Sequence, residues 1–305
     1  STRANLFAKE FPKRFFQMGV AEQNMMGVAA GLALTGKVPF VCSFAVFSPG
    51  RSWDQLRVSV CYSKANVKVI GGHVGFSNGG DGGTHQALED IAMTRCLPNL
   101  SVVAPADAEQ ARLATLAIAK HEGPVYMRIS RDGGVGTISE MGSGDSGATA
   151  GSVSGVSLDK AEHFEFGKAQ FLKTGQDVTI ICCGLMVGQV LSTLPQLAKQ
   201  GIDAEVINLH TIKPLDLKTL LRSAEKTRAV VTVEEHQKMG GMGSAVLEGL
   251  ASVGHWPVPV ELVGVEDSFG ESGQPQELRE KYGLGAAAIA AAVKRALDRK
   301  CIATR

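Results

Sequence analysis

The sequence lacks a charge excess of either sign, a cysteine pair spaced for a metal, and an apolar run of membrane-spanning length. Thirty-one Lys and Arg residues are balanced by 30 Asp and Glu residues, so the net charge is +1. Such a chain gives no reason to expect a nucleic-acid partner or an anionic membrane surface. The six cysteines are scattered and include no CxxC pair, which argues against a zinc site or a disulfide framework. We therefore expect a reducing compartment and a cytoplasmic location.

Length and pattern predict an α/β protein with two domains. A chain of 305 residues with 44% hydrophobic content can fill two cores. Strand and helix patterns alternate in both halves, which favours mostly parallel sheets covered by helices. Residues 136–160 are rich in Gly, Ser, Ala and Thr, as is typical of a linker. We predict a first domain at 1–135 with its beginning missing, a linker at 136–160, and a second domain at 161–305.

Residues 15–47 form the segment around which the first half is organised. The pattern predicts an apolar strand at 14–18, a helix at 21–34 and a second strand at 38–44. No charge follows Glu22 until the helix has ended, and a helix that is apolar on all sides is a buried helix. Glu22 is therefore expected among apolar groups, which strengthen proton binding by a carboxylate. An acid in a first turn can also simply complement the helix dipole, so Glu22 alone identifies no site.

Three motifs follow one another along the first half: GVAEQN at 19–24, SFAVF at 43–47 and GDGGTHQ at 80–86. In this combination they resemble the pyrimidine-binding domain of transketolase, a thiamine-diphosphate enzyme. The resemblance extends from Phe11 to about Leu297 and so includes the transketolase C-terminal domain. It implies the C-terminal half of a transketolase, as a split subunit or a fragment. The pyrophosphate-binding half, with its metal ligands, is absent.

The resemblance assigns the cofactor contacts of this half. Glu22 would hold N1′ of the aminopyrimidine, and so activate thiamine diphosphate. Phe44 and Phe47 would supply the apolar face on which the pyrimidine stacks, although core packing alone would also explain them. Mg²⁺ or Ca²⁺ would be bound mainly by the missing N-terminal half, and we expect no metal ligand in this chain.

The motif GDGGTHQ also begins like the diphosphate and magnesium motif of thiamine enzymes. That motif ends at an Asn some way downstream, whereas Asn99 is too near, and no strand-to-helix phosphate turn surrounds Asp81. The heptad instead matches the DGxTHQ substrate loop of transketolase. By that resemblance, Asp81 would hold a substrate hydroxyl. His85 would lie over the reacting carbonyl and move protons or polarise its oxygen at near-neutral pH.

Two further side chains follow predicted strands and match phosphate-binding positions of the family. His73 and Arg131 suit a dianion, because Arg offers a planar fork and His a tunable donor, although both could be surface residues. Arg51 leaves two possibilities open: it could face the same cleft, or it could pair with Asp54 on a helix surface.

The second half shows no catalytic constellation. Glu234, Glu235 and His236 lie at a predicted strand end and are interpreted as a structural corner. The remaining histidines are expected to be structural or solvated: His121, His163, His210 and His255.

The resemblance implies transfer of a two-carbon ketol unit between sugar phosphates. Deoxyxylulose-phosphate synthase shares the layout and the DGxTHQ loop, but usually has His where this chain has Asn24. The β subunit of 2-oxo-acid dehydrogenases shares the domain pair and lacks the loop. A non-catalytic scaffold or regulatory partner is a rival from another class, and the retained Glu22 and His85 argue against it.

The resemblance also predicts the assembly. The Ala- and Gly-rich helix at 21–34 is too apolar to face water, so part of it is expected in the domain core and part on another chain. Gly240, Gly241 and Gly243 are expected to permit close helix approach, and in the family both regions lie at or near the dimer contact. We expect a homodimer, and an α2β2 tetramer with the N-terminal half.

Overall fold

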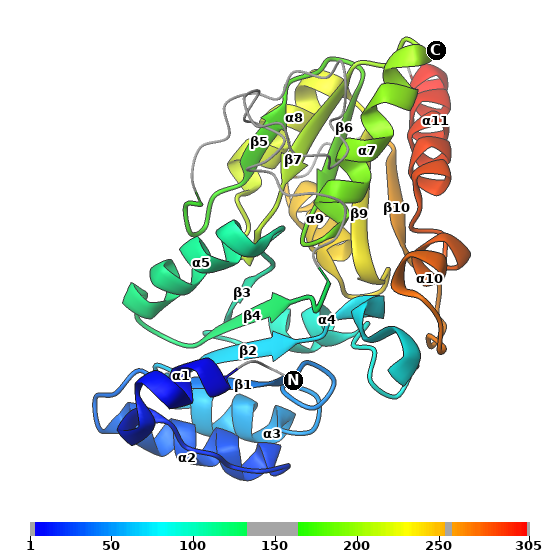
Figure 1. The fold of residues 1–305 in the computed structure, drawn as a ribbon. Coiled ribbons are helices and arrows are strands. Elements are labelled where there is room, and N and C mark those ends of the chain that lie inside the picture. Colours follow the sequence, from blue (N-terminus) through cyan, green and yellow to red (C-terminus); the bar gives the residue numbers. More distant parts are fainter. Residues whose placement is uncertain (1–3, 133–163, 254–257, 304–305) are drawn as a thin grey trace.

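The computed structural model describes residues 4–132, 164–253 and 258–303, which form two five-stranded sheets with helices packed on them (Figure 1). The strand orders are β1-β2-β4-β3-β8 and β10-β9-β6-β7-β5. The pairs are parallel except β3 with β8 and β5 with β7. The predicted α/β class is therefore confirmed. The predicted linker at 136–160 falls outside the described residues.

The first sheet carries the segments in which the site residues were predicted. Its strands are β1 (Phe40–Phe44), β2 (Lys68–Gly72), β3 (Ser101–Val103), β4 (Val125–Ile129) and β8 (Thr211–Lys213). Its helices are α1 (Asn5–Glu10), α2 (Glu22–Leu34), α3 (Trp53–Gln55), α4 (Asp90–Arg95) and α5 (Ala108–Lys120). A π-helical segment, Leu56–Tyr62, continues α3. In Figure 1, α1, α2 and α3 gather beside β1 at one end of the molecule.

The second sheet has helices on both faces. Its strands are β5 (Gln170–Lys173), β6 (Val178–Cys182), β7 (Ala204–Asn208), β9 (Val230–Gln237) and β10 (Val260–Val265). Its helices are α7 (Met186–Lys199), α8 (Leu217–Thr227), α9 (Met242–Ala251), α10 (Pro275–Lys281) and α11 (Ala286–Ala303). Helices α7 and α11 pack together, as do α8 and α9 (Figure 1). No helix in the described part of the chain is long and apolar enough to cross a membrane.

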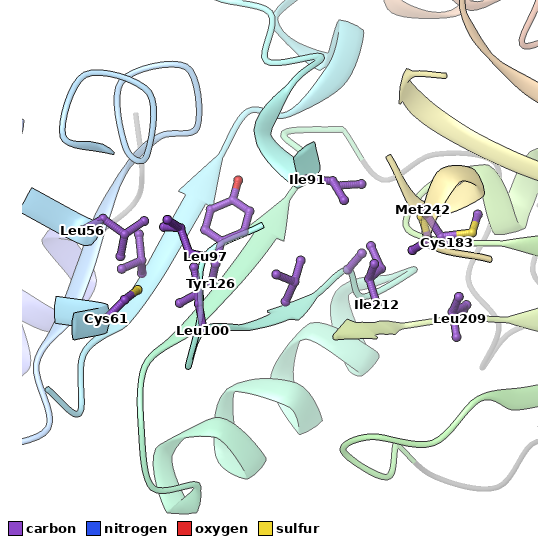
Figure 2. Close-up of a cluster of buried hydrophobic side chains, with 14 of the residues drawn as sticks. Leu56, Cys61, Ile91, Leu97, Leu100, Tyr126, Cys183, Leu209, Ile212 and Met242 are labelled. Carbon is purple, nitrogen blue, oxygen red and sulfur yellow. The ribbon is translucent and has the colours of Figure 1, made fainter. Parts of the chain in front are cut away.

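The two sheets are joined by a strand that the sequence analysis missed. Strand β8 follows β7 of the second sheet, yet it pairs antiparallel with β3 of the first, Val102 opposite Lys213. Beside this crossing, one buried cluster runs from Leu56 and Tyr126 to Met242 (Figure 2). A continuous apolar core ties the halves together, because separating them would expose this surface to water.

Two predictions in the first segment need correction. The apolar strand expected at 14–18 does not form: Pro12–Arg14 is a short 3₁₀ turn, and Phe16 is 59% exposed with no neighbouring strand. Helix α2 is buried on one face only. On its other face Val28 is 38% exposed, and Leu34 at the end of the helix is 71% exposed, so this chain alone leaves apolar surface of α2 uncovered.

Candidate active site

Three parallel strands end at the same edge of the first sheet, and predicted site residues follow those ends. Phe44 at the end of β1 is in register with Gly72 at the end of β2, which is in register with Ile129 at the end of β4. His73 follows Gly72 directly, and Arg131 lies two residues beyond Ile129. Ligands of open α/β sheets bind at this carboxyl edge, so the topology brings the predicted residues to a suitable place.

Aromatic rings form the floor of this edge. The His73 ring stacks on Phe44, with centroids 3.8 Å apart and planes inclined by 16°. Phe44 and Phe47 lie 6.1 Å apart, nearly parallel. His85 meets both phenylalanines edge-on, at 6.2 and 5.4 Å. Four of the predicted site residues thus form one contiguous cluster of stacked and edge-to-face rings.

A buried amide that the sequence analysis missed holds both histidines in place. Asn78 lies in the 3₁₀ segment Gly75–Asp81, and its Nδ2 donates to the backbone carbonyl of His73 at 2.9 Å and to that of His85. The Thr84 hydroxyl lies 2.9 Å from His85 Nδ1. Asn78 belongs to no recognised motif, and only the folded loop brings the two carbonyls within reach of one side chain.

Glu22 is the first residue of α2 and is buried, with 4% of its surface exposed. Its Oε2 accepts a hydrogen bond from Nη1 of Arg51 at 2.8 Å. The Arg51 guanidinium also lies over the Phe47 ring, 4.6 Å from its centroid. The alternatives left open for Arg51 are thereby decided: it faces the site and pairs with Glu22, not with Asp54.

The predicted phosphate and hydroxyl contacts lie at the rim of this cluster. Arg131 is exposed, and its backbone N–H donates to the Ser77 hydroxyl at 3.3 Å. Within the described residues no carboxylate pairs with its guanidinium. Burial, and next the charge of Arg131, lower the pKa of His73, while exposed Asp81 raises it. The lowered pKa favours the neutral form of His73, and the charges of Arg131 and Asp81 act on it in opposite directions.

The second sheet supports this rim through a buried ion-pair network. Arg279 on α10 donates to Asp132 and to Glu235, each at 2.7 Å, and Asp132 directly follows Arg131. A methyl group on Gly75 would overlap the Glu235 carboxylate, so the loop after β2 rests directly on Glu235. Burial raises the pKa of Glu235, and Arg279 opposes that shift. The loop after β2 is thus supported by Glu235 and Arg279 of the second half of the chain.

Glu234 and His236, the rest of the predicted structural corner, are buried and hydrogen-bonded within the protein. Glu234 accepts the first two backbone N–H groups of α9, at 2.6 and 2.8 Å, and His236 accepts the backbone N–H of Ala92 at 3.3 Å. A side chain on Gly241 or Gly243 would overlap or crowd Glu234. Gly241 therefore makes room for a carboxylate, which corrects its expected role in helix approach, whereas Gly240 lies directly against Ala92 of helix α4.

Of the remaining histidines, the two that the structure describes take no part in the site. His121 and His210 each pack against a phenylalanine ring. His163 and His255 lie outside the described residues. Among the residues that the structure describes, no group of three or more His, Cys, Asp or Glu side chains could hold a metal ion.

The residues at the edge suit a flat, nitrogen-containing ring such as an aminopyrimidine. A buried carboxylate, Glu22, can accept an N–H, and the face of Phe47 can take a planar group beside it. The Arg51 guanidinium, which is itself planar with N–H donors, already makes this pair of contacts. The donor set therefore fits the pyrimidine half of the cofactor that the motifs imply.

Comparisons with known proteins agree with this geometry. Residues 1–134 match the family described as transketolase, pyrimidine binding domain, and residues 167–289 match transketolase, C-terminal domain. The chain is 43% identical to the 6-deoxy-6-sulfo-D-fructose transketolase subunit SqwH of Clostridium sp. (strain MSTE9), over 96% of this chain and 84% of that protein. It is 37% identical to the 1-deoxy-D-xylulose-5-phosphate synthase of Desulfitobacterium hafniense (strain DSM 10664 / DCB-2), over 96% of this chain and 43% of the synthase.

A solved structure extends the similarity to three dimensions. It is described as a split-gene transketolase in an inactive β4 tetramer, and it superposes on this chain with a TM-score of 0.83. The two sequences are 44% identical, and the match covers 98% of this chain and 90% of the other. The chain therefore belongs to the transketolase family, and it carries that family's pyrimidine-binding and C-terminal domains.

Proposed function

We propose that this chain is the C-terminal subunit of a split transketolase, which transfers a two-carbon ketol unit between sugar phosphates. The observation that carries the proposal is the buried Glu22 carboxylate, which Arg51 links to the ring cluster of Phe44, Phe47, His73 and His85. In this proposal, residues 1–135 form the pyrimidine-binding domain, 136–160 the linker and 161–305 the C-terminal domain.

Glu22 and the ring cluster hold the cofactor pyrimidine. Glu22 donates or shares a proton at N1′, and the face of Phe47 packs against the ring while Phe44 supports Phe47. Thiamine diphosphate, when bound, supplies the carbon nucleophile that carries the two-carbon unit. One face of Phe44 is already covered by His73 at 3.8 Å, so Phe47 is the better stacking surface.

The rim residues bind the substrate. His85 lies edge-on to both phenylalanines, where it can move a proton at the substrate carbonyl, and Asp81 takes a hydroxyl. Exposed Arg131 gives a phosphate a planar fork, and His73 lies near enough to be affected by its charge. The Arg131 guanidinium, which is always charged, supplies the positive charge of this contact, and His73 supplies a hydrogen bond.

The other half of the active site belongs to a partner. A pyrophosphate-binding N-terminal subunit holds the diphosphate together with Mg²⁺ or Ca²⁺, and the complete enzyme is an α2β2 tetramer built on a homodimer of this chain. Two observations support this assembly: the uncovered apolar face of α2, and the similar split-gene chain that forms an inactive β4 tetramer.

Co-expression with the candidate N-terminal subunit tests the proposal. The pair is expected to transfer a ketol unit between sugar phosphates when thiamine diphosphate and Mg²⁺ are present. The chain by itself is expected to be inactive and to bind the cofactor poorly, because its described residues include no metal cluster. Micromolar, magnesium-dependent cofactor binding by the chain without a partner would contradict this division of the site.

A second candidate is a reaction like that of deoxyxylulose-phosphate synthase, which the 37% identity to such a synthase supports. Asn24 favours transketolase, because the synthase usually has His at that position. Assaying the assembled pair for both products separates the two candidates. A pair that binds the cofactor and forms neither product would support a scaffold or regulatory role instead.

A further inference from the structure

Arg51 makes the two contacts in the site that the cofactor pyrimidine would need. Its Nη1 lies 2.8 Å from Glu22 Oε2, and its guanidinium carbon lies 4.6 Å from the centroid of the Phe47 ring. A guanidinium is planar and delocalised and presents N–H donors at its edge, as an N1′-protonated aminopyrimidine does. The Arg51 guanidinium and the aminopyrimidine would therefore use the same acid, Glu22, and the same face of Phe47. Only one of them can occupy this position at a time.

The two partners of this ion pair differ in how firmly they are held. The Glu22 side chain is 5% exposed and is fixed at the start of α2, whereas the Arg51 side chain is 49% exposed. The backbone N–H of Arg51 donates to the Phe47 carbonyl at 2.9 Å, so a single helical turn places its side chain over that ring. Among the described residues, no other carboxylate lies within salt-bridge distance of Arg51. A half-exposed ion pair is a weak one, so Arg51 can leave while Glu22 stays.

We infer that Arg51 is a displaceable substitute for the cofactor pyrimidine. It pairs with Glu22 and covers Phe47 while the cofactor is not bound, and it moves outward when the aminopyrimidine enters. This inference rests on the proposed function, because it takes Glu22 as the acid that meets N1′. The ion pair has a physical purpose: a buried carboxylate without a partner is costly, and Arg51 supplies one until the cofactor does.

Displacement makes Arg51 a determinant of cofactor affinity. When a binding-competent state is only partly populated, the apparent dissociation constant rises by the inverse of that fraction. Removing the guanidinium should therefore tighten binding of thiamine diphosphate. An ion pair with one half-exposed partner, together with a cation–π contact, corresponds to a change of about tenfold in the dissociation constant. A residue with a merely structural role would give the opposite sign, because its loss would loosen the site.

The test measures the dissociation constant of thiamine diphosphate, with Mg²⁺, by calorimetry on this chain assembled with its pyrophosphate-binding half. Arg51→Met keeps an unbranched apolar side chain and is expected to bind about tenfold more tightly than wild type. Arg51→Lys keeps the charge without the planar fork, so its dissociation constant should lie between those of the wild type and Arg51→Met. This variant still tests the inference if Arg51→Met does not assemble. Arg57→Met removes an exposed arginine from the neighbouring π-helical segment and is expected to leave the constant unchanged. An Arg51→Met constant equal to or weaker than wild type would overturn the inference.

The Glu22→Gln background separates this inference from the proposed function. Gln has no negative charge to pair with Arg51, so adding Arg51→Met to Glu22→Gln should change the dissociation constant by less than it does in the wild type. If Glu22→Gln leaves both cofactor affinity and exchange of the cofactor C2 proton unchanged, Glu22 is not the activating acid and the proposed function fails. If Glu22→Gln slows exchange but Arg51→Met does not tighten binding, only the role of Arg51 is wrong.

Discussion

Glu22 begins helix α2, and Glu234 lies on strand β9 with its carboxylate at the start of α9; both are buried, one in each half of the molecule, yet their partners differ. Glu234 accepts two backbone N–H groups of α9, at 2.6 and 2.8 Å, and is 2% exposed. Glu22 begins α2, is 4% exposed, and within the described residues its hydrogen-bond partner is the half-exposed side chain of Arg51. The helix fixes the positions of its backbone donors, whereas a half-exposed side chain such as Arg51 can rotate away from its partner.

This difference indicates that Glu234 stabilises the fold, whereas Glu22 can exchange its partner for a ligand. Both satisfy the rule that a buried charge needs a partner, so burial alone would rank them equally as functional candidates. Burial raises the pKa of Glu234, and the α9 backbone donors oppose that shift. What distinguishes Glu22 is a replaceable partner beside an aromatic face, and the first prediction tests that distinction.

Glu22→Gln should give the largest effect on chemistry. Gln can hydrogen-bond to the cofactor but cannot transfer a proton to N1′, and an acid–base group of this kind contributes about a thousandfold. Exchange of the cofactor C2 proton in the assembled enzyme, followed by NMR after acid quench, should slow by about that factor. Assembly and melting temperature should stay close to wild type. Exchange at the wild-type rate would remove Glu22 from the catalytic machinery.

Buried His210 makes the stability of the protein depend on pH. Burial lowers the pKa of His210 from 6.5 to about 4, and its ring packs on Phe164 at 4.3 Å. Because the folded pKa lies below the unfolded one, the unfolded chain binds more protons between these values, so stability falls as pH drops from about 6.5 to 4. The loss from His210 is about 3 kcal/mol at most. Urea unfolding at pH 7 and pH 4.5 measures it.

A matched variant isolates the His210 contribution. His210→Gln keeps a polar side chain next to Thr211 without an ionisable ring, so its unfolding free energy should depend less on pH over the same interval. The pKa of His73 is also lowered by burial, but His73 lies at the proposed substrate site. His73→Gln is therefore expected to raise KM for phosphorylated sugars. An unchanged pH dependence in His210→Gln would show that other groups control acid stability.

Glu234→Gln should have the opposite effect to Glu22→Gln: a loss of stability without a change in cofactor chemistry. Gln retains one acceptor oxygen for the two α9 donors and turns an N–H₂ group toward the other, so the unfolding free energy should fall by about 2 kcal/mol. Urea denaturation of the assembled enzyme measures this loss. Exchange of the cofactor C2 proton should remain at the wild-type rate wherever the protein is folded. A slowed exchange in a stable Glu234→Gln enzyme would break the distinction between the two acids.

Much of the fold and part of the site could be predicted from the sequence, because both rest on local pattern. The alternation of strand and helix patterns predicted the two mostly parallel sheets, which the structure contains. Phe44, Phe47 and His85 were found through short motifs, and the structure brings these rings into contact.

The features that sequence missed depend on contacts between distant segments. Strand β8 is only three residues long and pairs with a strand about a hundred positions earlier, so no periodicity marks it. Asn78 matters because the folded loop brings two carbonyls to one amide. Arg51 joined Glu22 over 29 positions, and sequence could not choose between Glu22 and Asp54. The strand expected at 14–18 did not form, because an apolar run needs a neighbouring strand and no strand in the described part of the chain pairs with this segment.

Arg131 and Arg279 differ in the same way as the two glutamates: Arg279 is buried and held by its ion pairs, and Arg131 is accessible. Replacing Arg131 gives the smallest predicted effect. Arg279 is 3% exposed and bound to Asp132 and Glu235, so its loss should destabilise the fold. Arg131 is exposed, with no carboxylate partner among the described residues, so its charge is available to a substrate phosphate. Arg131→Ala should raise KM for phosphorylated sugars about tenfold, the value of one charge-assisted contact, and should change KM less for an unphosphorylated analogue. Steady-state kinetics of the assembled enzyme on both substrates measures the ratio, and equal losses on the two would assign Arg131 a structural role.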